Sequence, residues 1–146
     1  MTIFRLKHEF TPRDTSGHFR FPFNIDKECR RLTIKYKYSP KTLEDSEYSL
    51  RLIDECFRRY GIEASEERKA AELPLNNLIT ISLDSPEGLV GTAHRHLNDA
   101  RYEISESYSS AGFFPAKITA GEWAVTLSAH AVLSQKVIAE VEVSVD

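Results

Sequence analysis

Apolar and polar residues alternate along most of the chain, and this pattern predicts β-strands. Three alternating stretches follow one another at residues 4–10, 18–25 and 30–38. A period of two is typical of strands with one face in a core and one face in water. Pro22 lies inside the second stretch, and proline cannot donate a ladder hydrogen bond. We therefore expect this strand at the edge of a sheet or at a bulge.

The period becomes helical in the next part of the chain. Apolar residues recur three and four positions apart at Tyr48, Leu52, Ile53, Cys56, Phe57 and Tyr60. This stripe predicts one amphipathic helix over residues 43–60, with Gly61 at the position of a C-cap. The charged stretch 62–75 predicts a mobile surface connection or a short solvated helix.

Alternation returns after residue 76 and continues to the end of the chain. Strand-like stretches lie at residues 76–83, 89–97, 100–105, 122–133 and 136–146. The whole pattern predicts about eight strands and one inserted helix in a single domain over residues 1–146. Clean alternation favours antiparallel sheets, and two such sheets bury their apolar faces by packing together. We expect an antiparallel β-sandwich, with a closed barrel as the alternative.

Composition narrows the classes of function. The 146 residues are 41% hydrophobic and 28% charged, and the net charge is −3. Charges of both signs are mixed along the chain, so we expect neither a nucleic acid nor a membrane surface as partner. The N-terminus lacks the apolar core of a signal peptide, which predicts a cytoplasmic protein. Cys29 and Cys56 are predicted to be buried free thiols.

His94, Arg95 and His96 form the most suggestive local pattern. On a strand, residues two apart point the same way, so the two imidazoles would share one face. Such a pair can supply two metal ligands, but a metal site needs more. A third ligand would come from a carboxylate or from His8, His18 or His130. The alternative is that the two histidines are partly exposed strand residues bonded to neighbouring loops.

Other candidate features have a plain structural interpretation beside the functional one. Trp123 could stack on a carbohydrate, although an aromatic residue at a strand entry is more often part of a core. The aromatic row Phe19, Phe21 and Phe23 could stack on bases, but few Lys or Arg residues accompany it. No nucleophile elbow or phosphate-binding loop occurs in the sequence. We therefore expect no catalytic residues and no cofactor.

Four motifs in the second half of the chain carry a family resemblance. They are the turn Asp84–Gly88 and the segments Gly91–His96, Gly112–Pro115 and Gly121–Leu127. Together they span about residues 76–133. This stretch resembles an N-terminal domain that precedes the catalytic domain in some bacterial metallohydrolases of the polymerase and histidinol phosphatase (PHP) family. The chain departs from that pattern at Asp84-Ser85-Pro86 and at Ala116-Lys117.

The resemblance implies a β-sandwich accessory domain, of a jelly-roll or pre-peptidase C-terminal-like type. It implies no metal site in this chain, because the metal ligands of the family belong to the downstream catalytic domain. The first functional hypothesis is accordingly a non-catalytic interaction domain that docks on a PHP-type hydrolase or forms a homo-oligomer. The second is a carbohydrate- or small-ligand-binding module that uses His94, Arg95, His96 and Trp123. The third is a metal-dependent hydrolase built on His94 and His96.

Overall fold

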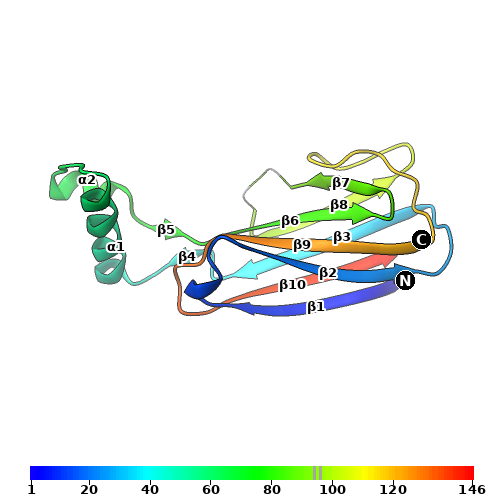
Figure 1. The fold of residues 1–146 in the computed structure, drawn as a ribbon, viewed down its shortest axis with the longest axis horizontal. Coiled ribbons are helices and arrows are strands. Elements are labelled where there is room, and N and C mark those ends of the chain that lie inside the picture. The colour runs from blue at the N-terminus through cyan, green and yellow to red at the C-terminus, as the bar shows by residue number, and fades with distance from the viewer. Residues whose placement is uncertain (94, 96) are drawn as a thin grey trace.

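Two antiparallel sheets pack face to face in the computed structural model, which describes residues 1–93, 95 and 97–146 (Figure 1). The first sheet has the strand order β1 (Thr2–Phe10), β10 (Val137–Val145), β3 (Arg31–Ser39) and β8 (Asp99–Ser105). The second has the order β2 (Gly17–Ile25), β9 (Gly121–Ala131), β6 (Leu78–Ser85) and β7 (Gly88–Thr92). This confirms the predicted antiparallel β-sandwich. Strand β2, which contains Pro22, lies at an edge as expected.

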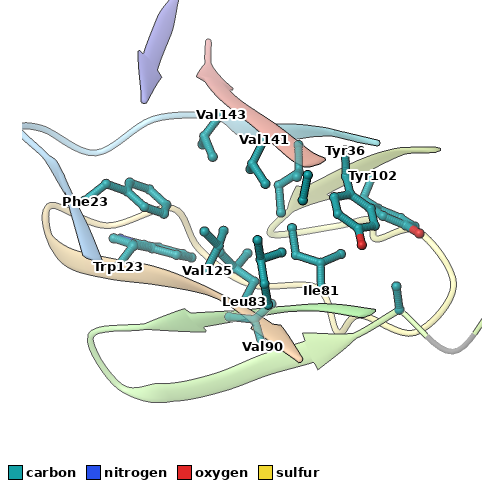
Figure 2. Packing of buried hydrophobic residues seen from close by; sticks show 14 of the residues in the cluster. Phe23, Tyr36, Ile81, Leu83, Val90, Tyr102, Trp123, Val125, Val141 and Val143 are labelled. Carbon is teal, nitrogen blue, oxygen red and sulfur yellow. The ribbon is translucent and has the colours of Figure 1, made fainter. Parts of the chain in front are cut away.

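The alternation in the sequence determines which side chains enter the core. In β10 every second residue is at most 7% exposed: Val137, Ala139, Val141, Val143 and Val145. Figure 2 shows Val141 and Val143 packed opposite Trp123 and Val125 of the second sheet. Fully burying one such side chain contributes about 1.5–3 kcal/mol, so this packing is the main source of the sandwich's stability.

Two tyrosine hydroxyls join the sheets across the core. The Tyr36 hydroxyl of β3 donates to the carbonyl oxygen of Ile79 in β6 at 2.6 Å. The Tyr38 hydroxyl donates to the carbonyl oxygen of Asn77 at 3.2 Å. Burial raises the pKa of Tyr36 well above its ordinary value, so the hydroxyl remains a donor. These bonds place β3 directly over β6.

Residues 42–76 form an arm that projects from one end of the sandwich (Figure 1). Its base is a pair of two-residue strands, β4 (Thr42–Leu43) and β5 (Leu75–Asn76). The arm carries helix α1 (Ser46–Arg59) and the short helix α2 (Glu66–Ala71). None of the helices in the described part of the chain is long and apolar enough to cross a membrane.

Helix α1 begins three residues later than the sequence predicts. Thr42 and Leu43 belong to β4, and the Asp45 carboxylate accepts a hydrogen bond from the Tyr48 backbone N–H at 2.9 Å, which caps the helix. The C-terminus is as predicted. Gly61 has a φ of 66°, and the Ile62 N–H donates to the Phe57 carbonyl at 2.8 Å, as in a Schellman motif.

The arm has a small core of its own. Leu43 and Ile53 are at most 9% exposed, yet they lie outside the apolar cluster that fills the sandwich. Lys69 of α2 donates to the Asp54 carboxylate of α1 at 2.7 Å. This hydrogen bond lowers the pKa of Asp54 and raises that of Lys69, so it links the two helices in their charged states.

Asn77 anchors the arm to the sandwich. It is 1% exposed. Its amide nitrogen donates to the Pro40 carbonyl at 3.0 Å and to the Ser134 hydroxyl at 2.8 Å. Its amide oxygen accepts from the backbone N–H groups of Leu133 and Ser134. The side chain thus uses all four of its hydrogen-bonding positions, and it ties the arm's base to the connection between β9 and β10.

Candidate functional site

The side of the sandwich where β7 and β8 lie is closed by the loop of residues 106–116. Along β8, the Ser110 N–H donates to the Glu103 carbonyl at 2.9 Å, and the Ser110 hydroxyl accepts from the Glu103 N–H at 2.9 Å. Along β7, the Phe114 N–H donates to the Val90 carbonyl at 2.9 Å. The loop therefore covers both strand edges, which would otherwise offer backbone groups to another strand.

Two glycines allow this loop to cross β7 at close range. A Cβ atom on Gly91 would lie 2.4 Å from the Gly112 carbonyl oxygen and 2.5 Å from the Phe113 Cα. A Cβ atom on Gly112 would lie 2.4 Å from the Thr92 carbonyl oxygen, and Gly112 has a φ of 93°. Each position excludes a side chain because backbone lies in its way. This crossing gives a physical reason for the glycines of the Gly91–His96 and Gly112–Pro115 motifs.

Successive phenylalanines in the loop point in opposite directions. Phe113 is 6% exposed and packs against Tyr102 with ring centroids 5.1 Å apart. Phe114 is 71% exposed, and Leu89, on the neighbouring strand β7, is 65% exposed. We call Leu89 and Phe114 the edge patch. It consists of two large apolar side chains in water, held on backbone that the glycine crossing fixes in place.

Of the predicted ligand-binding triplet, only Arg95 falls within the described residues, where it is exposed. His94 and His96 lie outside them, so the hydrolase hypothesis built on this pair stays a prediction. Strand β7 ends at Thr92, and the predicted strand over residues 89–97 is therefore shorter than expected. Within the described residues, no group of three or more His, Cys, Asp or Glu side chains could hold a metal ion.

The structure does not support a stacking role for Trp123. Its side chain is 0% exposed, and its indole Nε1–H donates to the Thr119 carbonyl at 2.9 Å. A buried ring with its polar atom satisfied offers no face to a ligand, so the alternative that it belongs to the core is correct. Phe23 is likewise buried, and Phe19 and Phe21 pack against the same core.

The cysteines are free thiols, as predicted, but only partly buried. Cys29 is half-buried, and Cys56 is exposed on α1. The prediction of burial is wrong for Cys56 because the apolar stripe of α1 is wider than the face that the small core of the arm covers. Tyr60, which follows the last residue of α1, is exposed for the same reason.

A hollow of about 880 Å³ lies on the outer face of the first sheet. Its floor is the backbone of one row of paired residues, Leu6, Val141, Tyr36 and Ala100. Two rows of polar side chains form its walls. One row is Arg5, Glu142, Lys35 and Arg101, and the other is Lys7, Glu140, Lys37 and Asp99. Exposed pairs such as Lys37 and Glu140, 3.1 Å apart, contribute at most about 1 kcal/mol.

In the sequence Gly91 and Gly112 are noticed only as members of the resemblance motifs, and Leu89 and Phe114 are missed as site residues because their apolar character favours a place in the core. Arg95 as a ligand-binding residue stays a prediction. Asn77 is missed because the sequence places it, with Asn76, at the polar start of the predicted strand 76–83, and nothing there indicates a buried side chain.

No protein-family model matches the chain, and no curated protein matches it. Among solved structures, the pre-peptidase C-terminal domain of collagenase from Bacillus anthracis is similar over 97% of this chain and 89% of its own, with 10% identity and a TM-score of 0.49. Aeromonas hydrophila PliG, a periplasmic lysozyme inhibitor of g-type lysozyme, is similar over 99% and 87%, with 12% identity and a TM-score of 0.43. The resemblance to the PHP-associated domain is not tested by these comparisons.

Proposed function

We propose that this chain is a non-catalytic accessory domain that docks on a partner protein through the edge patch. The observation that carries the proposal is that Phe114 is 71% exposed and Leu89 is 65% exposed. Both lie on backbone that the close approach of Gly91 and Gly112 holds in place. Aromatic residues that enter a pocket of a partner commonly dominate the energy of an interface. Burying Phe114 in such a pocket would contribute about 1.5–3 kcal/mol.

The fixed backbone around the edge patch also lowers the entropic cost of binding. Because hydrogen bonds and a buried neighbour, Phe113, hold the backbone on both sides of Phe114, little conformational entropy is lost on docking. Tyr108, in the same loop, is also exposed, at 57%. A surface of this kind is typical of protein–protein contact rather than of a site for a small polar ligand.

The partner in this proposal is the catalytic domain of a PHP-type metallohydrolase, which would be the enzyme, in the cytoplasm. This choice of partner is supported by the family resemblance and by the position in the fold of the motifs that carry it. Two of the motifs that carry the resemblance, Gly91–His96 and Gly112–Pro115, supply the glycines of the crossing that presents the patch. The alternative partner for the edge patch is a second copy of the chain.

Size-exclusion chromatography with light scattering tests the proposal, on the chain alone and mixed with a PHP-type hydrolase domain. The expected result is a complex that Phe114→Ser weakens at least tenfold. Tyr60→Ser is the matched control, since Tyr60 is equally exposed, at 71%, but lies on the arm. A chain that remains monomeric with every such hydrolase contradicts the proposed partner. A complex that Phe114→Ser leaves intact contradicts the proposed surface.

The hollow on the first sheet favours a second candidate, a small-ligand-binding module. Its volume falls within the range of ligand sites, about 300–1,000 Å³. Its ligand would have to carry charges of both signs, because Lys35 and Lys37 face it beside Glu140 and Glu142. Saturable binding of a zwitterionic compound that Lys35→Ala abolishes would support this candidate over docking.

A further inference from the structure

The outer face of the second sheet carries a different chemistry from that of the first. Its outward residues include six with hydroxyl or methyl side chains: Thr80, Ser82, Thr92, Ala124, Thr126 and Ser128. Arg20 lies two residues from His18 and pairs with Thr126, whereas Asp84 and Glu122 lie further from the end at which β9 finishes. Interface cores are depleted of charged side chains, so this face, which carries fewer of them, can meet another protein surface more readily than the charged outer face of the first sheet.

Two histidines lie together at that end of the face. His18 of β2 and His130 of β9 are both exposed, and their ring centroids are 6.5 Å apart with the rings nearly perpendicular, at 81°. His18 Nδ1 is hydrogen-bonded to the Ser128 hydroxyl at 2.8 Å. His130 Nε2 is hydrogen-bonded to the Thr80 hydroxyl at 2.9 Å. Each ring is therefore oriented by a hydroxyl on an adjacent strand.

This arrangement matches the way proteins prepare imidazoles for a metal. A metal-bound histidine commonly bonds through its second nitrogen to a neighbouring polar group, which fixes the tautomer and the ring orientation. Here His18 Nε2 and His130 Nδ1 make no hydrogen bond to any of the described residues and are the nitrogens left for a ligand bond. With Zn–N bonds of about 2.0–2.1 Å, two rings on one tetrahedral zinc have centroids about 5 Å apart. A movement of roughly 1 Å by two exposed side chains closes that gap.

Two ligands do not complete a tetrahedral site. Among the described residues, no third His, Cys, Asp or Glu joins the pair closely enough to hold a metal. A second copy of the chain, related by a two-fold axis through the metal, would supply the same two imidazoles again. Two-fold symmetry is the commonest symmetry of homo-oligomers, and four neutral imidazoles suit Zn²⁺.

We propose that the outer face of the second sheet is a zinc-dependent homodimer interface, in which His18 and His130 of two copies together bind one Zn²⁺ ion. The inference does not rest on the proposed function, because Leu89 of the edge patch, on the edge strand β7, pairs with Asp84, toward the end of this face away from His18 and His130. Because the metal binds the dimer and not the separate chains, zinc shifts the monomer–dimer equilibrium by mass action.

The test measures zinc binding and mass together on the tag-free chain. Sedimentation equilibrium is run with EDTA and with ZnCl₂, and the zinc bound per chain is determined by calorimetry. The expected result is a monomer in EDTA and a dimer in zinc, with half a zinc ion per chain. His18→Ala and His130→Ala each abolish the dimer. Ser128→Ala leaves both ligands in place but weakens zinc binding about 10–100-fold, as loss of an orienting partner does.

Two controls separate this site from other zinc sites. Thr126→Ala changes the same face without removing a ligand or an orienting hydroxyl, and it keeps the zinc-dependent dimer. The double variant His94→Ala/His96→Ala also keeps it. One zinc ion bound per monomer, no zinc binding at all, or a zinc dimer that survives His18→Ala overturns the proposal. Circular dichroism of each variant establishes that a lost dimer is not a lost fold.

Discussion

The gap between the two sheets is closed differently at the two long sides of the sandwich. At the side of β1 and β2, aromatic rings from both sheets turn inward and meet. Phe4 and Phe23 stack with centroids 5.3 Å apart, and Phe10 is 0% exposed beside Phe19. The short 3₁₀ turn Pro12–Asp14 connects the two strands. At the side of β7 and β8, a loop covers the strand edges and leaves Phe114 exposed.

The difference shows that Phe114 is not needed to close the sandwich. Phe113 already fills the gap between the sheets on that side, and the hydrogen bonds of the loop satisfy the strand edges. Single exposed apolar side chains are ordinary on protein surfaces, so the proposed contact rests on Phe114 together with Leu89 and on the backbone that the crossing holds in place. Substitutions of residues that close a side should therefore destabilise the fold, and substitutions of residues that face outward should not.

The largest effect is expected for Phe10→Ala. Removing a fully buried ring should lower the free energy of unfolding by about 3–5 kcal/mol, measured by urea denaturation. A loss below about 1 kcal/mol would mean that the inward rings do not hold the β1–β2 side together.

Gly91→Ala should have the next largest effect. The new methyl group would meet the Gly112 carbonyl oxygen, so the crossing must open, at a cost of about 1–3 kcal/mol. Thr92→Ala, at the next position, is the control and should cost less than about 1 kcal/mol. Thermal unfolding followed by circular dichroism compares the two. Equal stability of both variants would show that the crossing is loose.

Two tyrosine-to-phenylalanine substitutions should differ in their effect on the free energy of unfolding. The Tyr102 hydroxyl is buried without a hydrogen-bond partner among the described residues, so Tyr102→Phe should be neutral or stabilise by about 1 kcal/mol. The Tyr36 hydroxyl donates to Ile79, so Tyr36→Phe should destabilise by about 1 kcal/mol or more. Chemical denaturation of both variants measures the difference. A destabilised Tyr102→Phe would reveal a bond from that hydroxyl and contradict this account of the β7–β8 side.

The smallest effect on stability is expected for Phe114→Ser. Because the Phe114 side chain is exposed and does not pack in the core, its substitution should change the free energy of unfolding by less than about 0.5 kcal/mol. A loss of 2 kcal/mol or more would place Phe114 among the residues that close the side, and the comparison would fail.

Alternation in the sequence predicts the long strands and which of their faces enter the core, but it makes β7 too long and does not predict the exposure of Leu89. It was not sufficient for contacts between distant segments. Gly91 and Gly112 are recognisable as glycines, but their mutual approach arises only when the loop returns to β7. Strands β4 and β5 are too short to show a period, and the start of α1 shifted with them. Asn77 is a polar residue whose burial depends entirely on the connection between β9 and β10.

Hydrogen exchange with mass spectrometry tests the central claim most directly. The chain is compared alone and in the presence of a PHP-type hydrolase domain. Docking through the edge patch predicts slower exchange in residues 88–92 and 112–116, with no change in β1, β2 or the arm. Unchanged exchange throughout, or protection confined to β1, β2 or the arm, would contradict it.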